Sequence, residues 1–334
     1  MAPYFSLIVC TYMRPDPLVK LLQSVQKQTL YPNEVIVIDG SQNEETRIAL
    51  QQNLFNNLHY YKVSDQQRGL TKQRNIGIAK AGKQSEIICF LDDDIVLEPD
   101  YFEKLIGTYS DFPAALGVGG YIVNETVWEK VSPESPVKSS EFQYDGWKRK
   151  DSSRYIIRNF FGLDSDCTPA FSPTFSHGRS VSFLPPTGKT YDAEQLMGGV
   201  SSFKRAVFDE FSFSAYFQGY GLYEDADFTI RVAKKGKLYV NTAAKVFHYH
   251  NESGRPNQYN YGKMVVRNGW YVWRIKNPKP SFADKIKWHA ITLLLIVIRY
   301  CNIFTASGKK AVFTEALGRT SAWVRLWVDK PRLQ

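Results

Sequence analysis

The chain has 334 residues, of which 43% are hydrophobic and 14% aromatic, enough for one large core or a core with an appendage. Its 42 basic and 33 acidic residues give a net charge of +9, which predicts an anionic partner such as nucleotide phosphates, nucleic acid or an acidic membrane surface. The basic residues are scattered, and they are most concentrated near the C-terminus beside apolar runs, which argues against nucleic acid.

Cysteine usage and the start of the chain indicate the compartment. The cysteines lie far apart and form no CxxC pair, and Cys10 and Cys89 fall inside apolar runs. We therefore expect reduced thiols and a cytosolic protein. The first five residues have no basic segment or long apolar run, so we expect no signal peptide.

The first third of the chain alternates short apolar runs with amphipathic segments. Strands are predicted over residues 6–10, 35–38, 58–63 and 87–91, and helices over residues 17–28, 44–53, 70–81 and 99–109. This alternation is typical of an α/β protein with a parallel sheet, in which ligands bind at the carboxyl ends of the strands. Because Thr11, Asp39 and Asp92 each directly follow a strand, we expect them at one edge of the sheet.

Three consecutive carboxylates, Asp92, Asp93 and Asp94, end the fourth of these strands. They repel one another and would be costly at a buried strand end without a counter-charge. A divalent cation, or a phosphate held through one, would remove that cost. The alternative is an acidic turn in contact with water.

The second half of the chain is less regular. Strands are predicted over residues 117–123, 196–203, 237–241 and 246–250, and helices over residues 204–210 and from about residue 224 to residue 235. Residues 124–190 are rich in Ser, Pro and aromatic residues. We interpret them as a variable insertion that either walls a pocket or packs as a surface loop.

Two clusters of polar residues follow in this half. Glu224, Asp225 and Asp227 occupy the first turn of a predicted helix, where the helix dipole favours acids, and Asp227 can pair with Arg231 four residues later. His248 and His250 would share one face of a strand, as structural residues or as metal ligands.

From Ser281 onward the sequence consists of apolar segments flanked by basic and Trp residues. Residues 285–300 contain an apolar core of roughly ten residues, whereas a membrane span needs about 20. Residues 311–330 form a second amphipathic segment, and basic and Trp residues flank both. This pattern predicts a helical tail that docks on anionic lipid. The alternative is packing on the preceding domain or on a second subunit.

Six motifs together resemble the inverting family 2 glycosyltransferases of GT-A fold. In chain order they lie at residues 6–12, 35–41, 74–77, 91–94, 198–199 and 224–227. The resemblance covers residues 4 to about 250. It implies the GT-A fold, an α/β architecture with a mixed sheet flanked by helices. It also implies a nucleotide-sugar donor and a divalent metal, Mn²⁺ or Mg²⁺.

The resemblance implies roles for residues at the nucleotide. Asp39 would hydrogen-bond the base, since its carboxylate suits an imide N–H. Thr11 and Arg14 would line the nucleotide. Arg74 would lie near the phosphates, whose oxygens suit a planar guanidinium.

The same resemblance implies a metal site at the acidic triplet. Asp94 would bind the metal, while Asp92 and Asp93 would contact the ribose, the sugar or the metal. His248 would complete the metal site, with His250 as the alternative ligand.

On the acceptor side, Asp225 resembles the catalytic base of the family, with Glu224 beside it at the acceptor. Gly199 would let the acceptor or the sugar approach the backbone. In a single displacement, Asp225 would take the proton of an acceptor hydroxyl as its oxygen attacks the anomeric carbon.

We therefore predict a GT-A catalytic domain over residues 1–280, with a nucleotide-sugar half (1–123) and an acceptor half (124–280), followed by a helical tail over residues 281–334. The donor would be a UDP-, dTDP- or GDP-sugar and the acceptor a glycan or lipid-linked glycan of the cell envelope. The enzyme would sit in the cytoplasm as a peripheral protein at the inner face of the cell membrane, as a monomer or an oligomer. The competing hypotheses are a sugar nucleotidyltransferase and a non-catalytic glycan-binding scaffold on a membrane surface.

Overall fold

The computed structural model describes residues 3–249 and 257–333. The chain divides into two compact units, one of residues 1–128 and 180–254 and the other of residues 129–179 and 255–334. This division differs from the predicted boundary at residue 280, because the insertion at 129–179 groups with the C-terminal helices.

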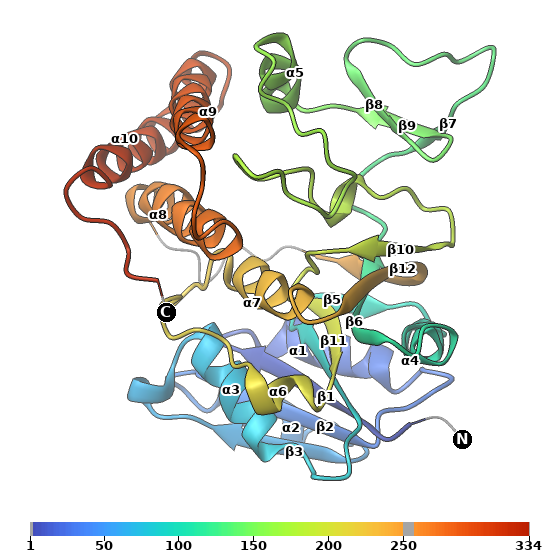
Figure 1. Ribbon diagram of the computed structural model, residues 1–334. Helices are drawn as coiled ribbons and strands as arrows, with labels where there is room; N and C mark the ends of the chain where they lie inside the picture. Colours follow the sequence, from blue (N-terminus) through green and yellow to red (C-terminus); the bar gives the residue numbers. More distant parts are fainter. Residues whose placement is uncertain (1–2, 250–256, 334) are drawn as a thin grey trace. The chain divides into compact units, whose positions relative to one another are not determined.

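The first unit is built on one mixed sheet, which has nine strands among the described residues (Figure 1). The strands are β1 (Phe5–Thr11), β2 (Glu34–Asp39), β3 (Leu58–Lys62), β4 (Ile87–Asp92), β5 (Ile95–Leu97), β6 (Ala115–Ile122), β10 (Thr190–Ala193), β11 (Val200–Lys204) and β12 (Lys237–His248). Their order is β10-β12-β6-β11-β4-β1-β2-β3, with β5 paired to β12. Strands β3, β2, β1 and β4 are parallel, and β11 runs antiparallel between β4 and β6.

Helices cover this sheet on both faces. The helical elements of this unit are α1 (Pro15–Val25), α2 (Glu45–Gln51), η1 (Asp65–Gln67), α3 (Leu70–Lys80), α4 (Tyr101–Asp111), η2 (Val181–Phe183), α6 (Val207–Glu210) and α7 (Glu224–Ala233). Alternate strand residues such as Leu7 and Val9 belong to one core cluster with the apolar stripes of α1 and α4. On the other face, the ring of Phe90 contacts those of Phe208 and Phe213.

Strand β12 corrects the prediction of two separate strands at 237–241 and 246–250. It is continuous over Lys237–His248, and its pairing with β6 shifts register between Val240 and Lys245. The break in apolar pattern therefore marks a shift of register within one strand and not the boundary between two strands. His248 ends this strand, and the alternative ligand His250 lies outside the described residues.

The second unit joins the insertion to three long helices. Its elements are β7 (Glu129–Lys130), β8 (Glu141–Tyr144), β9 (Trp147–Lys150), α5 (Ser153–Phe160), α8 (Gln258–Lys276), α9 (Phe282–Cys301), η3 (Asn302–Phe304) and α10 (Lys309–Arg325). Strands β7, β9 and β8 form a small antiparallel sheet. Trp270, Trp273 and Trp288 share a buried core with residues of α10.

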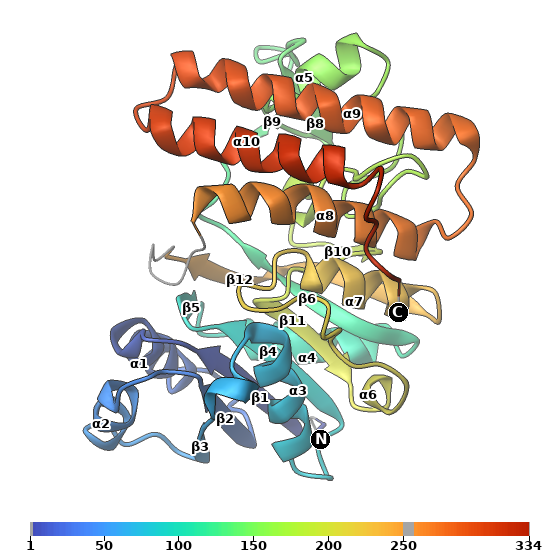
Figure 2. The same cartoon turned by 90° about the vertical axis from the view of Figure 1, so that its left-hand side faces the viewer.

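Figure 2 shows α8, α10 and α9 lying side by side. Helices α8 and α10 meet at two glycines, since a Cβ on Gly262 would lie 2.2 Å from the carbonyl oxygen of Glu315 and one on Gly318 would lie 2.1 Å from that of Tyr259. Among the described residues, one helical stretch, Phe282–Phe304, is long and apolar enough to cross a membrane by length and composition. The sequence had predicted an apolar core too short for that.

Candidate active site

The predicted strand-end residues meet at one edge of the sheet in the first unit. In the parallel register, Thr11 of β1 lies opposite Asp39 of β2, and Cys10 lies opposite Asp92 of β4. The strands end together because each apolar run stops at a polar residue in matching register. The expected co-location of these residues is therefore present.

Asp93 is one of two buried members of the acidic triplet, with Asp94. Its two carboxylate oxygens accept hydrogen bonds from the Thr11 hydroxyl at 2.7 Å and from Arg14 Nη1 at 3.1 Å. Burial raises the pKa of Asp93 to about 6, although Arg14 and Thr11 oppose the shift. Arg14 supplies the counter-charge that three adjacent carboxylates require, and it also contacts Asp94 Oδ2 at 3.3 Å.

Asp94 forms a carboxylate–imidazole pair with His248. His248 Nε2 lies 3.1 Å from Asp94 Oδ1, and its Nδ1 lies 2.8 Å from Glu125 Oε1. Burial lowers the pKa of His248, but the bonds to Asp94 and Glu125 outweigh it and raise the pKa to about 10. Glu125 thus orients the imidazole so that Nε2 faces the acidic triplet.

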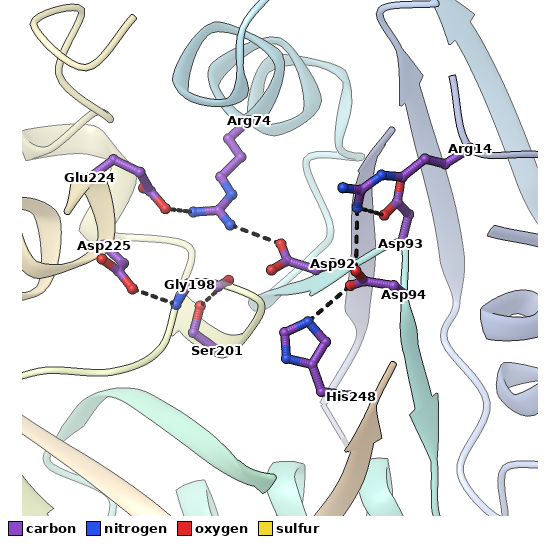
Figure 3. A network of polar contacts seen from close by, with 10 residues as sticks. All are labelled: Arg14, Arg74, Asp92, Asp93, Asp94, Gly198, Ser201, Glu224, Asp225 and His248. Carbon is purple, nitrogen blue, oxygen red and sulfur yellow. Dashed lines mark hydrogen bonds and ion pairs between the residues drawn. The ribbon is translucent and has the colours of Figure 1, made fainter. Parts of the chain in front are cut away.

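Asp92 is the member of the triplet that a ligand can reach. Its side chain is 41% exposed, against 6% for Asp93 and 7% for Asp94. Arg74 Nη2 lies 3.4 Å from Asp92 Oδ1, while Arg74 Nη1 donates to Glu224 Oε1. Through these two contacts, the buried guanidinium of Arg74 connects the end of β4 to the start of helix α7 (Figure 3).

The Gly198–Gly199 pair makes room for this ion-pair bridge. A Cβ on Gly198 would lie 2.7 Å from both Arg74 Nη1 and Glu224 Oε1, and one on Gly199 would lie 2.2 Å from Asp92 Oδ2. The group whose close approach requires glycine at position 199 is therefore the Asp92 carboxylate. The approach of a sugar or acceptor to that backbone stays a prediction.

Glu224 and Asp225 open helix α7 after Tyr223, whose φ of 70° is left-handed. Burial raises the pKa of Glu224, Arg74 lowers it and Asp225 raises it, and the result is about 8. The other oxygen of Glu224, Oε2, is buried without a hydrogen-bond partner among the described residues. The partly exposed Asp225 accepts hydrogen bonds from the Gly198 and Ala226 amides at 3.2 and 2.8 Å.

Two further predicted residues are tied into the protein itself. Asp39 is fully buried and accepts hydrogen bonds from the Tyr60 hydroxyl at 2.8 Å and the Ser41 amide at 2.7 Å. Its predicted contact with a base would have to form beside these bonds. The predicted pair of Asp227 and Arg231 is confirmed, at 2.7 Å.

The residues at the triplet suit a divalent cation shared with a ligand. Among the described residues, no group of three or more His, Cys, Asp or Glu side chains could hold a metal ion by themselves. Cations such as Mg²⁺ commonly bind through one or two carboxylates together with substrate phosphates and water. Asp94 and His248 place one carboxylate oxygen and one imidazole nitrogen side by side, and a bound cation would replace the proton on Nε2. The Glu125 contact at Nδ1 is the kind of support that metal-binding histidines receive.

Sequence reasoning missed Tyr60 and Glu125 as parts of this site. Tyr60 could have been predicted, because it lies on β3, which pairs with β2, the strand that carries Asp39. Glu125 follows the end of the glycine-rich strand β6 at Ile122 by three residues, whereas Asp39 and Asp92 are the last residues of their strands. The rule that polar residues at strand ends gather at one edge could have included it.

The structure is thus a mixed sheet with carboxylates at the carboxyl ends of neighbouring parallel strands. The structure is similar to that of mannosyltransferase PcManGT from Pyrobaculum calidifontis, solved in complex with GDP-Man and Mn²⁺. The similarity covers 99% of this chain and 89% of that one, with a TM-score of 0.55 and 14% sequence identity. This similarity confirms the predicted GT-A fold.

The family model for glycosyl transferase family 2 matches residues 6–175, about half of the chain. The protein therefore belongs to glycosyl transferase family 2, and the resemblance recognised from the motifs is confirmed.

Similar curated proteins share part of their length with this chain. One is the glucosyl-dolichyl phosphate glucuronosyltransferase of Haloferax volcanii, 35% identical over 130 residues, which are 37% of this chain and 40% of that protein. Another is the putative glycosyltransferase EpsH of Bacillus subtilis, 33% identical over 110 residues, which are 33% of this chain and 31% of that protein. The chain thus matches less than half the length of these relatives.

Proposed function

We propose that the protein transfers a sugar from a nucleoside-diphosphate donor to a hydroxyl group of a glycan or lipid-linked acceptor, with inversion at the anomeric carbon. The observation that carries the proposal is the Arg74 bridge. It joins the reachable carboxylate of Asp92 to the helix start that carries Asp225. Acids for the leaving group and for the nucleophile thus belong to one connected site.

The proposed reaction is a single displacement. The acceptor oxygen forms a bond to the anomeric carbon while the bond from that carbon to the diphosphate oxygen breaks. Asp225 accepts the hydroxyl proton, and such proton transfer contributes about 10²–10⁴-fold to the rate. The Gly198 and Ala226 amides hold the carboxylate of Asp225 in place for that task.

On the donor side, Asp94 and His248 would hold Mn²⁺ or Mg²⁺, with Asp92 directed to the donor sugar, the ribose or the same metal. When bound, the cation balances the charge that develops on the leaving diphosphate. Thr11 and Arg14 donate hydrogen bonds to Asp93, and Arg14 also contacts Asp94, so these two residues keep the triplet in position. The Mn²⁺ and GDP-Man in the similar mannosyltransferase support a divalent metal and a nucleotide-sugar donor.

The proposed acceptor is a lipid-linked glycan. The name of the Haloferax relative supports a lipid-linked glycan. A cytoplasmic enzyme at the inner face of the cell membrane would fit such an acceptor. Residues 129–179 belong to the second unit, and we propose that residues between 124 and 200 select the sugar and the acceptor.

A panel of UDP-, dTDP- and GDP-sugars tests the function. The full chain is incubated with each donor, with Mn²⁺ and with or without lipid-linked acceptors, and release of the nucleoside diphosphate is measured. Release from one nucleotide class is the expected result. Pyrophosphate release from a sugar phosphate and a nucleoside triphosphate would identify a nucleotidyltransferase instead. Absence of turnover and of any thermal shift with nucleotides would favour a non-catalytic scaffold.

A further inference from the structure

The hairpin of α9 and α10 carries an exposed apolar surface, which we call the hairpin face. Its members are Phe282, Ile286, Leu293, Val297, Phe304, Phe313, Leu317, Val324, Trp327 and Val328. Along α9 and η3 they recur at intervals of four and seven residues, and the same intervals recur along α10 and the turn that follows it. This spacing places one apolar stripe on each helix.

The two stripes lie on the same side of the hairpin. The rings of His289 and Trp327 stack at 4.8 Å between centroids, and those of Tyr300 and Phe313 lie 6.1 Å apart, so the helices run antiparallel. On a helical wheel with 3.6 residues per turn, the centre of each stripe lies about 90° from the line of contact with the other helix. Viewed along each helix from its N-terminus, the rotation from the contact to the stripe has the same direction in α9 and in α10. For antiparallel helices this places both stripes on one side.

Helix α8 packs on the side of α10 that faces away from its apolar stripe. The close approaches at Gly262 and Gly318 fix that contact on the side of α10 away from its stripe. The hairpin face itself stays accessible to solvent, with Val297 49% and Val324 56% exposed. Ten apolar side chains on one face exceed the scattered exposed residues that a soluble surface ordinarily carries.

The charge around the hairpin face identifies its partner. Residues 281–334 contain nine Lys and Arg against three Asp and Glu, so this short segment contributes +6 of the net charge of +9. Lys285 and Lys287 lie on either side of the α9 stripe, and Lys309 and Lys310 begin α10 beside its stripe. An apolar face with basic flanks matches an anionic lipid surface, where lysines reach the headgroups while their stems lie on apolar groups.

We propose that the α9–α10 hairpin lies flat on an anionic bilayer and inserts the hairpin face into the headgroup and acyl boundary. Although α9 is long enough to span a membrane, its other sides pack against residues of α8 and α10 in the same unit. Trp288 stacks on Trp273 at 5.4 Å, and Arg299 is ion-paired with the buried Glu315. Spanning would break these contacts and put charged groups in hydrocarbon at about 3 kcal/mol each by insertion scales.

A second copy of the chain is the less favourable partner. In a two-fold dimer the hairpin face would meet itself, and the basic flanks of both copies would come together. A bilayer containing acidic lipids gives those same flanks a counter-charge.

Vesicle sedimentation of the full chain tests the proposal without any sugar donor, so the outcome is independent of transferase activity. We expect binding to phosphatidylcholine vesicles that contain phosphatidylglycerol, with little binding to phosphatidylcholine alone and release by high salt or alkaline carbonate. Val297→Glu and Val324→Glu should each weaken binding at least about tenfold, since each removes a buried apolar side chain from the interface. Leu54→Glu is the matched control, since Leu54 is 93% exposed in the first unit, and it should bind as the wild type does.

Replacing Lys309 or Lys310 with Gln should weaken binding about fivefold each at low salt. Wild-type affinity of both Glu variants would overturn the proposal. So would retention in the pellet after carbonate, which indicates a span. A dimer that Val297→Glu dissociates without loss of vesicle binding would assign the hairpin face to a second copy. Val297→Gln serves in place of any Glu variant that fails to fold.

Discussion

Gly199 offers a direct test of the contact between the glycine pair and the acidic triplet. In Gly199→Ala, the added Cβ would lie 2.2 Å from Asp92 Oδ2, whereas ordinary contacts begin near 3.4 Å, so the carboxylate must move by about 1.2 Å. Asp92 is partly exposed and can turn toward solvent. We therefore expect a stability loss near the lower end of the 1–3 kcal/mol that overpacking costs.

The effect on activity should be larger than the effect on stability. A displacement of about 1 Å in a positioned group can cost about 100-fold in rate. With the donor identified by the panel, we expect kcat/KM for nucleoside diphosphate release to fall about 100-fold in Gly199→Ala. The melting temperature, measured on the same preparation, should fall by only a few degrees.

Gly107→Ala is the matched control for this substitution. Gly107 lies inside α4, and a Cβ there would have no neighbour within 4 Å. This variant should keep full activity and gain up to about 1 kcal/mol, because Gly is a poorer helix former than Ala. Activity of Gly199→Ala within threefold of the wild type would refute the reasoning that ties Asp92 to the reaction.

Two further predictions concern the metal and the buried glutamate. Asp94→Ala should abolish the thermal shift that Mn²⁺ produces together with the nucleotide, and an unchanged Mn²⁺ dependence would remove Asp94 from the metal site. For Glu224, a folded-state pKa raised from 4.5 to about 8 means that the folded protein keeps a proton which the unfolded chain loses, so this contribution to stability declines as pH rises from 4.5 to 8. The melting temperature of the wild type should therefore fall more steeply over that window than that of Glu224→Gln, and parallel profiles would contradict the assignment.

The part of the site that follows from local sequence could be predicted. Apolar runs that end in Thr11, Asp39 and Asp92 specify strands, and parallel strands bring their carboxyl ends to one edge. The same reasoning placed Glu224 and Asp225 at a helix start, where α7 begins. These features depend on short-range pattern and on one topological rule.

The contacts made through long separations in sequence could not be predicted. Arg74 was expected at phosphates, yet it is 150 residues from its partner Glu224 and bridges to Asp92 as well. Likewise the hydroxyl of Tyr60 on Asp39 depends on how β3 aligns with β2. Such partners are selected by the tertiary arrangement, which periodicity alone does not specify.

The grouping of the chain into units was also beyond local pattern. Residues 129–179 and the C-terminal helices lie far apart in sequence, and they share a unit through contacts such as the bond from Trp273 Nε1 to the Thr174 carbonyl at 2.8 Å. In β12, residues 242–245 interrupt the apolar pattern and led to the prediction of two strands, because a bulge within one strand and the end of a strand interrupt that pattern in the same way.

The central claim is that Asp225 takes the proton of the acceptor during inverting transfer, and Asp225→Asn tests it most directly. The measurement is the turnover rate at saturating donor and acceptor, with donor binding followed separately and the anomeric configuration of the product determined by NMR. The account predicts an inverted product from the wild type and a fall in kcat of at least about 100-fold in the variant, with donor binding preserved. Glu210→Gln, at an exposed acid away from the site, should retain full activity. Turnover of Asp225→Asn within tenfold of the wild type, or a product with retained configuration, would contradict the account.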